Sequence, residues 1–181
     1  INCAIHEGYP GHHLQLAAQN LHPGRIRSFC ESMELIEGWA SYCQNQVREL
    51  GFETSPESLF AHATEEVFNA ARLLTDVNLQ TRTWNFNEAV NFLMEQTRID
   101  KTSALAEIKR QTQSPGSQIS SLAGEFLLRQ TKHALQQQFK GDFTDRNFHD
   151  LVLYQGSLPF STIRQYFPEL MKASIKQHHR G

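Results

Sequence analysis

Residues 55–80, "SPESLFAHATEEVFNAARLLTDVNLQ", read as one long α-helix. Ser55 can cap its N-terminus, and Pro56 suits its first turn. Elsewhere in the 181-residue chain, apolar residues also recur at intervals of three and four, and alternating runs of strand length are rare. The sequence therefore predicts an all-α fold. Because no repeat, linker or shift in composition divides it, residues 1–181 are expected to form a single multi-helix domain.

Further helices are expected on both sides of this segment. A first helix covers about residues 2–20 and ends before Pro23 and Gly24, which mark a turn. The others are expected at about residues 29–50, 85–97, 100–112, 119–139 and 160–177, with a shorter helix between residues 140 and 159.

The composition excludes several classes of protein. The chain has 17 Lys and Arg against 19 Asp and Glu, and it has no long basic run, so no nucleic-acid partner is expected. Its apolar stretches are short and interrupted, so this segment is expected neither to cross nor to contact a membrane. Cys3, Cys30 and Cys43 have no C-x-x-C spacing and an odd count, which argues against a disulfide framework or a thiolate zinc site.

The first residue is Ile1 rather than Met, and a candidate metal motif begins five residues later. We therefore expect the chain to be the C-terminal fragment of a larger protein, with the N-terminal part of the parent absent. Neither the oligomeric state nor the compartment of the parent can be predicted from this segment.

The candidate motif is "HEGYPGHH", residues 6–13, in which histidines accompany a glutamate. In an unbroken helix, His12 would point about 240° away from His6, whereas His13 would face the same way but lie about 10 Å further along the axis. Two imidazoles must each approach a zinc ion to about 2 Å. An ideal helix therefore cannot bring these histidines to one metal.

The proline inside the motif changes this conclusion. Pro10 removes a backbone donor and clashes with the preceding turn, and Gly11 permits backbone geometry that other residues avoid. A bulge at "YPG", residues 9–11, is therefore expected to turn His12 toward His6 and to leave His13 pointing away. The alternative is that the histidines only cap a helix or lie on its surface.

A second motif is "ELIEGWASYCQ", residues 34–44. Glu37 falls in an otherwise apolar stripe, where burying an unpaired carboxylate would be costly. It is a candidate for the third protein ligand that a catalytic zinc site needs. Glu34, one turn earlier, is the competing ligand, and pairing of Glu37 with an Arg or His is the other alternative. Gly38 allows another helix to approach closely, and we expect that helix to be the first one.

Taken together, several segments resemble the C-terminal part of a bacterial family, domain of unknown function eight-eight-five, which is itself similar to gluzincin-type zinc metallopeptidases. These segments are "HEGYPGHHLQ", "LIEGWASYCQ", "AARLLTDVNLQ", "SPGSQISSLAG" and "FHDLVLYQGSLPFSTIR". The likeness extends from His6 to about Arg164. Full-length members are several times longer than this chain.

The resemblance implies hydrolysis of a peptide substrate with a zinc (Zn2+) cofactor. By this likeness, His6 and His12 are the imidazole ligands, Glu37 is the carboxylate ligand and Glu7 is the general base. His149 matches a family histidine and is expected to donate a hydrogen bond to the transition-state oxyanion.

Two further residues, Arg72 and Asp76, lie one turn apart in "ARLLTD". The resemblance makes them candidates for supporting the metal ligands. The alternative is an ordinary ion pair on the helix surface.

The chain departs from the family pattern at three positions. Ser121 and Gln111 stand where many relatives have Tyr, and Gln80 stands where they have His. Such tyrosines and histidines commonly steady the oxyanion in gluzincins. The departures keep open an alternative function, a peptidase-like helical domain that binds zinc or peptide without significant turnover.

Overall fold

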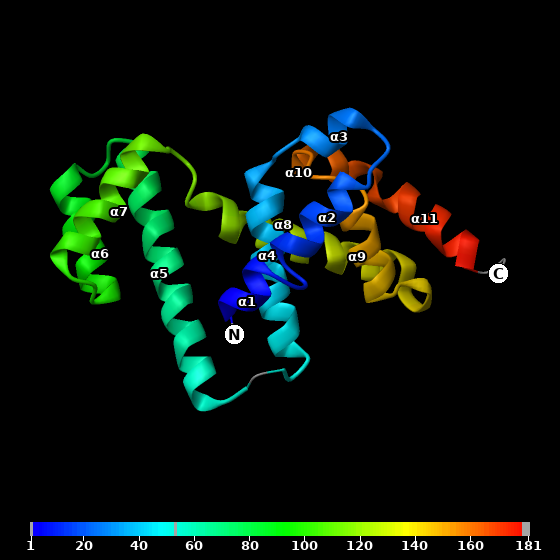
Figure 1. The fold of residues 1–181 in the computed structure, drawn as a ribbon, viewed down its shortest axis with the longest axis horizontal. Helices are drawn as coiled ribbons and strands as arrows, with labels where there is room; N and C mark the ends of the chain where they lie inside the picture. The colour runs from blue at the N-terminus through cyan, green and yellow to red at the C-terminus, as the bar shows by residue number, and fades with distance from the viewer. Residues whose placement is uncertain (1, 53, 179–181) are drawn as a thin grey trace.

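The structure is a computed structural model that describes residues 2–52 and 54–178, and these residues contain no β-strand. The helices are α1 (Asn2–Glu7), α2 (His12–Asn20), α3 (Arg25–Phe29), α4 (Met33–Glu49), α5 (Pro56–Gln80), α6 (Phe86–Thr97), α7 (Lys101–Gln113), α8 (Ile119–Phe139), α9 (Asp145–Leu153), α10 (Phe160–Ile163) and α11 (Phe167–His178), with short 3-10 turns η1 (Lys140–Asp142) and η2 (Arg164–Tyr166). The all-α prediction is confirmed (Figure 1). No helix in the described part of the chain is long and apolar enough to span a membrane.

Side-chain caps set the start of several helices. Ser55 accepts a hydrogen bond from the backbone of Ser58 at the start of α5, as the sequence predicts. Asn85 caps α6 in a capping box with Glu88, and Asp100 caps α7. Local sequence therefore determines where these helices begin.

The helix predicted over residues 160–177 is divided into α10, η2 and α11. Two other predicted helices, the first and second in the chain, are also divided or shortened. The first is interrupted between α1 and α2, where a break was expected. The second begins at Met33 rather than near residue 29, because the backbone before it is extended: Ser32 N–H donates to Ser157 O at 2.9 Å, and Glu31 forms an isolated bridge with Ser157. Tertiary pairing with the segment after α9 thus replaces the first turn of the predicted helix.

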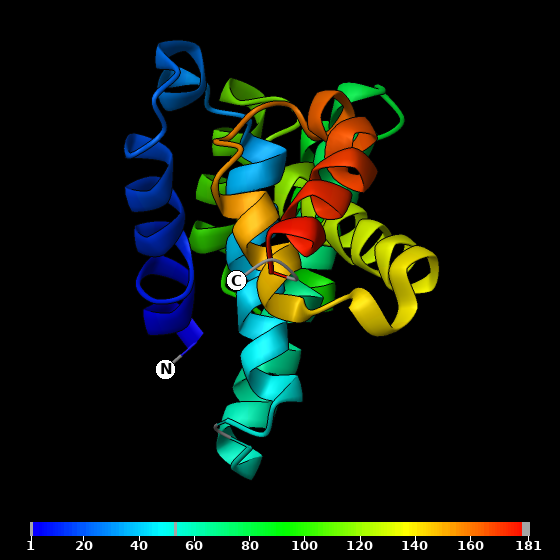
Figure 2. The same cartoon turned by 90° about the vertical axis from the view of Figure 1, so that its right-hand side faces the viewer.

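The described side chains pack into two hydrophobic clusters. The larger lies among α4, α8, α9, α10 and α11, and its biggest fully buried side chains are Trp39, Tyr42, Phe148, Phe160 and Phe167. The smaller lies among α5, α6 and α7, which form a separate group at one side of the molecule (Figure 1). Helices α1 and α2 follow one another along α4, on the face away from α11 (Figure 2).

Helices α4 and α8 cross in very close contact at two glycines. A Cβ on Gly38 would lie 2.4 Å from the carbonyl carbon of Gly124, and a Cβ on Gly124 would lie 1.8 Å from Glu34 O. The close approach predicted at Gly38 is therefore present, but its partner is α8. The expectation that the first helix packs there was wrong, because α1 and α2 pack along another face of α4.

Candidate metal centre

The break between α1 and α2 contains two extra residues and is closed by one wide backbone hydrogen bond, after a last ordinary helical one. Gly8 N–H donates to Ala4 O at 2.9 Å, and Gly11 N–H donates to Ile5 O at 3.0 Å, six residues back instead of four. The Tyr9–Pro10 peptide is cis. The backbone approaches so closely that a Cβ on Gly11 would lie 1.9 Å from the carbonyl oxygen of His6, so only glycine fits.

Helix α4 holds this break in place. The carbonyl oxygen of Pro10 accepts hydrogen bonds from Trp39 Nε1 at 2.9 Å and from the Cys43 thiol at 3.4 Å. Trp39 and Cys43 are both buried. The position of the break is therefore set by the same helix that contributes Glu37.

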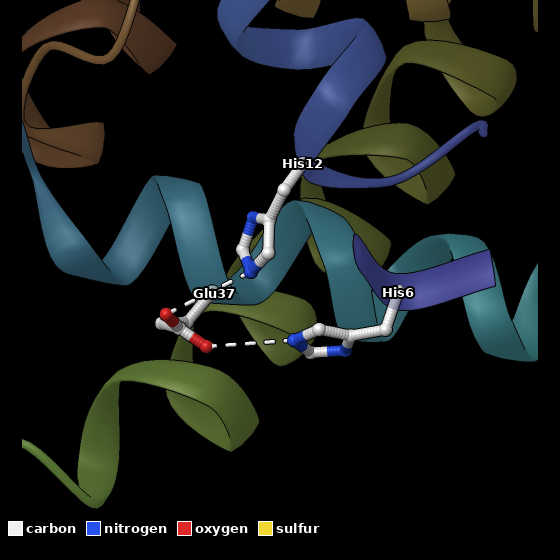
Figure 3. A group of neighbouring side chains, drawn as sticks. All are labelled: His6, His12 and Glu37. Carbon is white, nitrogen blue, oxygen red and sulfur yellow. Dashed lines mark ion pairs between the residues drawn. The ribbon is translucent and has the colours of Figure 1, made fainter. Parts of the chain in front are cut away.

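The break brings His12 toward His6, and both imidazoles face Glu37 (Figure 3). Nε2 of His6 lies 3.7 Å from one carboxylate oxygen of Glu37, and Nε2 of His12 lies 3.8 Å from the other. The three potential ligand atoms all lie within 4.8 Å of one another. His13, by contrast, is exposed.

The spacing of these atoms suits a single metal ion. Bonds of about 2.0–2.1 Å to a tetrahedral zinc ion would place two ligand atoms about 3.3 Å apart. Nε2 of His6 and Nε2 of His12 are each less than 1 Å beyond this value from an oxygen of Glu37, a different oxygen for each histidine. The three ligand atoms together lie within 4.8 Å of one another. Small side-chain rotations would close that difference, so the residues fit a zinc ion.

The two histidines are supported differently. Nδ1 of His6 lies 3.0 Å from Oε1 of Gln44, so an N–H on Nδ1 can donate to that oxygen and leave the Nε2 lone pair facing Glu37. Nδ1 of His12 is buried and has no hydrogen-bond partner among the described residues. Gln44 thus orients only one of the two imidazoles.

The electrostatics keep Glu37 charged and His12 neutral. The contact with His6 is the main cause that lowers the pKa of Glu37, and the positive charge of Arg72 adds to it. At 3.7 Å, Glu37 would form an ion pair with a protonated His6, and this contact raises the pKa of His6. Burial lowers the pKa of His12. A carboxylate and a neutral imidazole are the forms that bind metal.

The competing carboxylate has a different partner. Oε1 of Glu34 accepts a hydrogen bond at 2.9 Å from the backbone N–H of Phe160, at the start of α10. Of the two glutamates, Glu37 alone joins the histidines among the described residues.

A cleft of about 350 Å3 borders this group of residues. Its lining side chains come from α1, α4, α5, α7, the turn before α8 and the first turn of α8: Cys3, His6, Glu7, Met33, Glu37, Glu65, Asn69, Arg72, Arg110, Ser117, Gln118 and Ser121. Glu7 is exposed and lines the same cleft as His6 and Glu37, and it is not one of the three candidate ligands.

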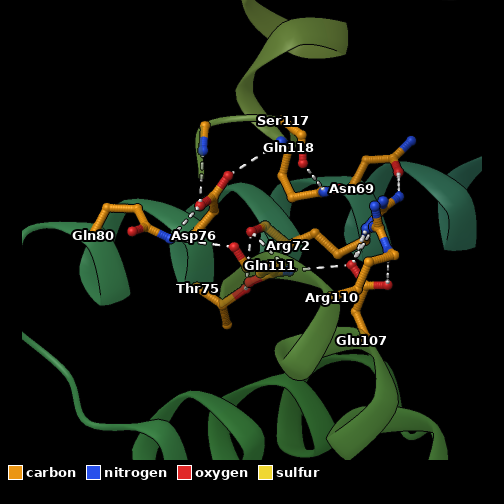
Figure 4. Close-up of polar contacts among 11 residues, drawn as sticks. Asn69, Arg72, Thr75, Asp76, Gln80, Glu107, Arg110, Gln111, Ser117 and Gln118 are labelled. Carbon is orange, nitrogen blue, oxygen red and sulfur yellow. Dashed lines mark hydrogen bonds and ion pairs between the residues drawn. The ribbon is translucent and has the colours of Figure 1, made fainter. Parts of the chain in front are cut away.

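The residues Arg72 and Asp76 do not pair with each other. Nε of Arg72 donates to Glu107 Oε1 at 2.7 Å, whereas Asp76 is fully buried and accepts backbone N–H bonds from Gly116 and Gln118, both at 3.2 Å (Figure 4). The alternative of a surface ion pair was therefore wrong. Asp76 instead holds the turn before α8, and this turn lines the cleft.

His149 is not among the described residues that line the cleft. Its Nε2 is 2.8 Å from the hydroxyl of Tyr42, and its ring packs edge-on against Trp39 with centroids 5.7 Å apart. Burial, followed by the charge of Lys132, lowers the pKa of His149. The structure therefore does not bring His149 to the candidate ligands, and its location gives no support to an oxyanion role.

The three departures from the family pattern occupy two environments. Ser121 lines the cleft, and its Oγ lies 2.6 Å from that of Ser41. Gln111 is fully buried and accepts a hydrogen bond from Thr75, and Gln80 donates to the Asp76 carboxylate (Figure 4). Gln80 and Gln111 thus belong to the packing behind the cleft wall.

Sequence reasoning missed several residues of the site. Gln44 follows Glu37 by seven positions and so shares its helix face, a signal that could have identified it. Glu65 and Asn69 precede Arg72 by seven and three positions on the same face of α5. Arg110 comes from α7, and nothing in its local sequence distinguishes it.

Comparisons with known proteins agree with this fold. The family described as "Bacterial protein of unknown function (DUF885)" matches residues 2–166. A crystal structure of a "putative lipoprotein" from Colwellia psychrerythraea is similar, with 26% identity and a TM-score of 0.86; the match covers 97% of this chain and 30% of that one. A "putative lipoprotein of unknown function" from Shewanella oneidensis shares the fold at 24% identity and a TM-score of 0.82, over 92% of this chain and 31% of that one.

The chain thus spans about a third of the length of these two proteins. No curated protein matches it. Because the family match covers most of its residues, the chain belongs to the DUF885 family of bacterial proteins of unknown function.

Proposed function

We propose that the chain is a zinc-dependent peptidase domain, in which His6, His12 and Glu37 bind the metal and Glu7 is the general base. The observation that carries this proposal is the convergence of three ligand atoms from α1, α2 and α4 within 4.8 Å of one another. Two imidazoles and one carboxylate are the donor set of many catalytic zinc sites, which keep a fourth position for water.

The cleft beside these residues supports a reaction on a bound substrate. Its volume of about 350 Å3 falls within the usual range for small-ligand pockets, about 300–1,000 Å3. His6 and Glu37 both line it, so a metal ion held by them would border the cavity in which we propose that a peptide binds.

The chemistry divides between the metal and this chain's residues. Zinc, when bound, would lower the pKa of a coordinated water and polarise the substrate carbonyl. Glu7 lies at the end of α1 with its carboxylate exposed in the cleft, where it can accept the proton of a water and pass it to the leaving amine. Gln44 fixes the ring of His6, and Glu37 balances the charge of the group.

A second candidate function is a peptidase-like domain that binds zinc or peptide without significant turnover. Ser121 favours this second function, because its small side chain lines the cleft at a position where, by the family resemblance, many relatives have a tyrosine. Its hydroxyl is engaged with Ser41, so it is a weaker source of oxyanion stabilisation than a phenol reaching into the cavity.

Replacing Glu7 by Gln tests the proposed function. Loss of a general base is expected to reduce peptide hydrolysis by about 10²- to 10⁴-fold, while zinc content stays unchanged because Glu7 is not a ligand. The measurement is the cleavage rate of an internally quenched peptide mixture by zinc-loaded protein. Glu95→Gln is the matched control, since this exposed residue of α6 lies outside the cleft.

Equal rates for wild type and Glu7→Gln would remove Glu7 as the base. Zinc binding by wild type without measurable cleavage would favour the second candidate function.

A further inference from the structure

We propose that Arg72 and Arg110 form a carboxylate-binding subsite in the cleft, and that the peptides bound there carry a carboxylate close to the scissile bond. This inference rests on the proposed function, because it names the substrate class of the same cleft. The observation behind this inference is that Arg72 and Arg110 both line the cavity and both contact the same carboxylate, that of Glu107.

The subsite lies on the wall formed by α5 and α7. Glu65, Asn69 and Arg72 follow one another at intervals of four and three residues, so they share one face of α5, and all three line the cleft. Arg110 joins them from α7 (Figure 4). The same cavity is bordered by His6 and Glu37.

The two arginines leave an excess of positive charge at their own end of this wall, away from Glu65. Nε of Arg72 and Nη2 of Arg110 each lie 2.7 Å from the same oxygen, Oε1 of Glu107. One carboxylate between two guanidinium groups leaves a net charge of +1. Glu107 also accepts a hydrogen bond from Gln111, which fixes it against the wall.

Donors remain on both guanidinium groups. Arg72 uses Nε toward Glu107 and Nη1 toward Asn69, and Arg110 uses Nε and Nη2 toward Glu107. Within residues 2–52 and 54–178, Nη2 of Arg72 and Nη1 of Arg110 have no hydrogen-bond acceptor. The planar fork of arginine matches a carboxylate in geometry and charge, which makes a carboxylate the fitting ligand.

Charge also varies along the cleft. Glu65 lies two helical turns before Arg72 on α5, a distance of about 10 Å along the axis. Along the α5 and α7 wall, the cavity therefore has the negative Glu65 at one end and the two arginines at the other, while Glu7 and Glu37 line it from α1 and α4. This polarity favours one orientation of a peptide, with its carboxylate at the arginine end.

Such a carboxylate has two sources, the C-terminus of a peptide or an acidic side chain. Three peptides separate them: N-acetyl-trialanine with a free carboxylate, the same peptide as its amide, and N-acetyl-Ala-Ala-Glu amide. Binding to the chelator-treated chain is measured by calorimetry, so that neither metal coordination nor turnover contributes.

At least one carboxylate peptide is expected to bind about tenfold more tightly than the neutral amide, the effect of a charge-assisted hydrogen bond. Arg110→Gln should remove this preference. The Arg110 side chain is 48% exposed, so the fold should tolerate the change. Arg110→Lys, which keeps the charge but loses the fork, should retain part of it. Arg146→Gln, an exposed arginine of α9 outside the cleft, should leave it intact.

Preference for the free C-terminus assigns the subsite to the α-carboxylate, and preference for the glutamyl amide assigns it to an acidic side chain. Equal binding of all three peptides, or a preference that survives Arg110→Gln, would overturn the inference. Because the measurement needs no hydrolysis, its failure is distinguishable from failure of the Glu7→Gln test.

Discussion

Replacing Glu37 by Gln is expected to weaken zinc binding by about 100-fold or more. Loss of a residue that only orients a ligand already costs about 10- to 100-fold in metal affinity, and Glu37 contacts both histidines itself. The substitution preserves the shape of the side chain but removes its negative charge, which a doubly charged ion needs for balance. The measurement is the zinc dissociation constant, obtained by competition with a chelating dye.

The matched control is Glu34→Gln, one turn earlier on α4. Its carboxylate accepts from Phe160 N–H, and the amide oxygen of glutamine can accept the same bond. Zinc affinity should therefore remain at the wild-type value. An equal loss in both variants, or no loss in either, would show that Glu37 is not the carboxylate ligand.

Replacing Gly124 by Ala is expected to destabilise the fold by about 3 kcal/mol, the upper part of the usual range for overpacking. The new Cβ would lie 1.8 Å from Glu34 O and 2.8 Å from Gly38 Cα, both of them backbone atoms that cannot rotate away. Alanine is favoured over glycine in a helix by only about 1 kcal/mol, which does not offset the clash. Urea denaturation followed by circular dichroism gives the free energy of unfolding.

Gly141→Ala serves as the control for this experiment. An added Cβ at Gly141 meets no atom within 4 Å, so the free energy of unfolding should change little. If Gly124→Ala proved as stable as wild type, α4 and α8 would have to cross at a greater distance than the structure describes.

Much of the helical framework can be predicted from local sequence. The cap at Ser55 and the break at Pro10 and Gly11 depend on residues whose backbone preferences act over a few positions. The approach of His12 to His6 follows from the same local argument, because two extra residues require the helix to open. These features needed no knowledge of the rest of the chain.

Contacts between distant segments could not be predicted in this way. Glu34 and Glu37 lie on the same helix, and only the approach of α10 shows which of them is occupied by a backbone N–H. Asp76 looked like the partner of Arg72, but its buried location assigns it to the turn before α8. Arg110 reaches the cleft through the packing of α7 on α5, for which the sequence contains no local signal.

X-ray absorption at the zinc edge tests the metal centre most directly. The chain loaded with one equivalent of zinc should show two imidazole nitrogens at about 2.0–2.1 Å and oxygen ligands at about 2.0–2.2 Å, and the His12→Ala variant should lose one imidazole. Sulfur at about 2.3 Å would instead identify a cysteine ligand such as Cys3, and an unchanged spectrum in His12→Ala would contradict the proposed centre.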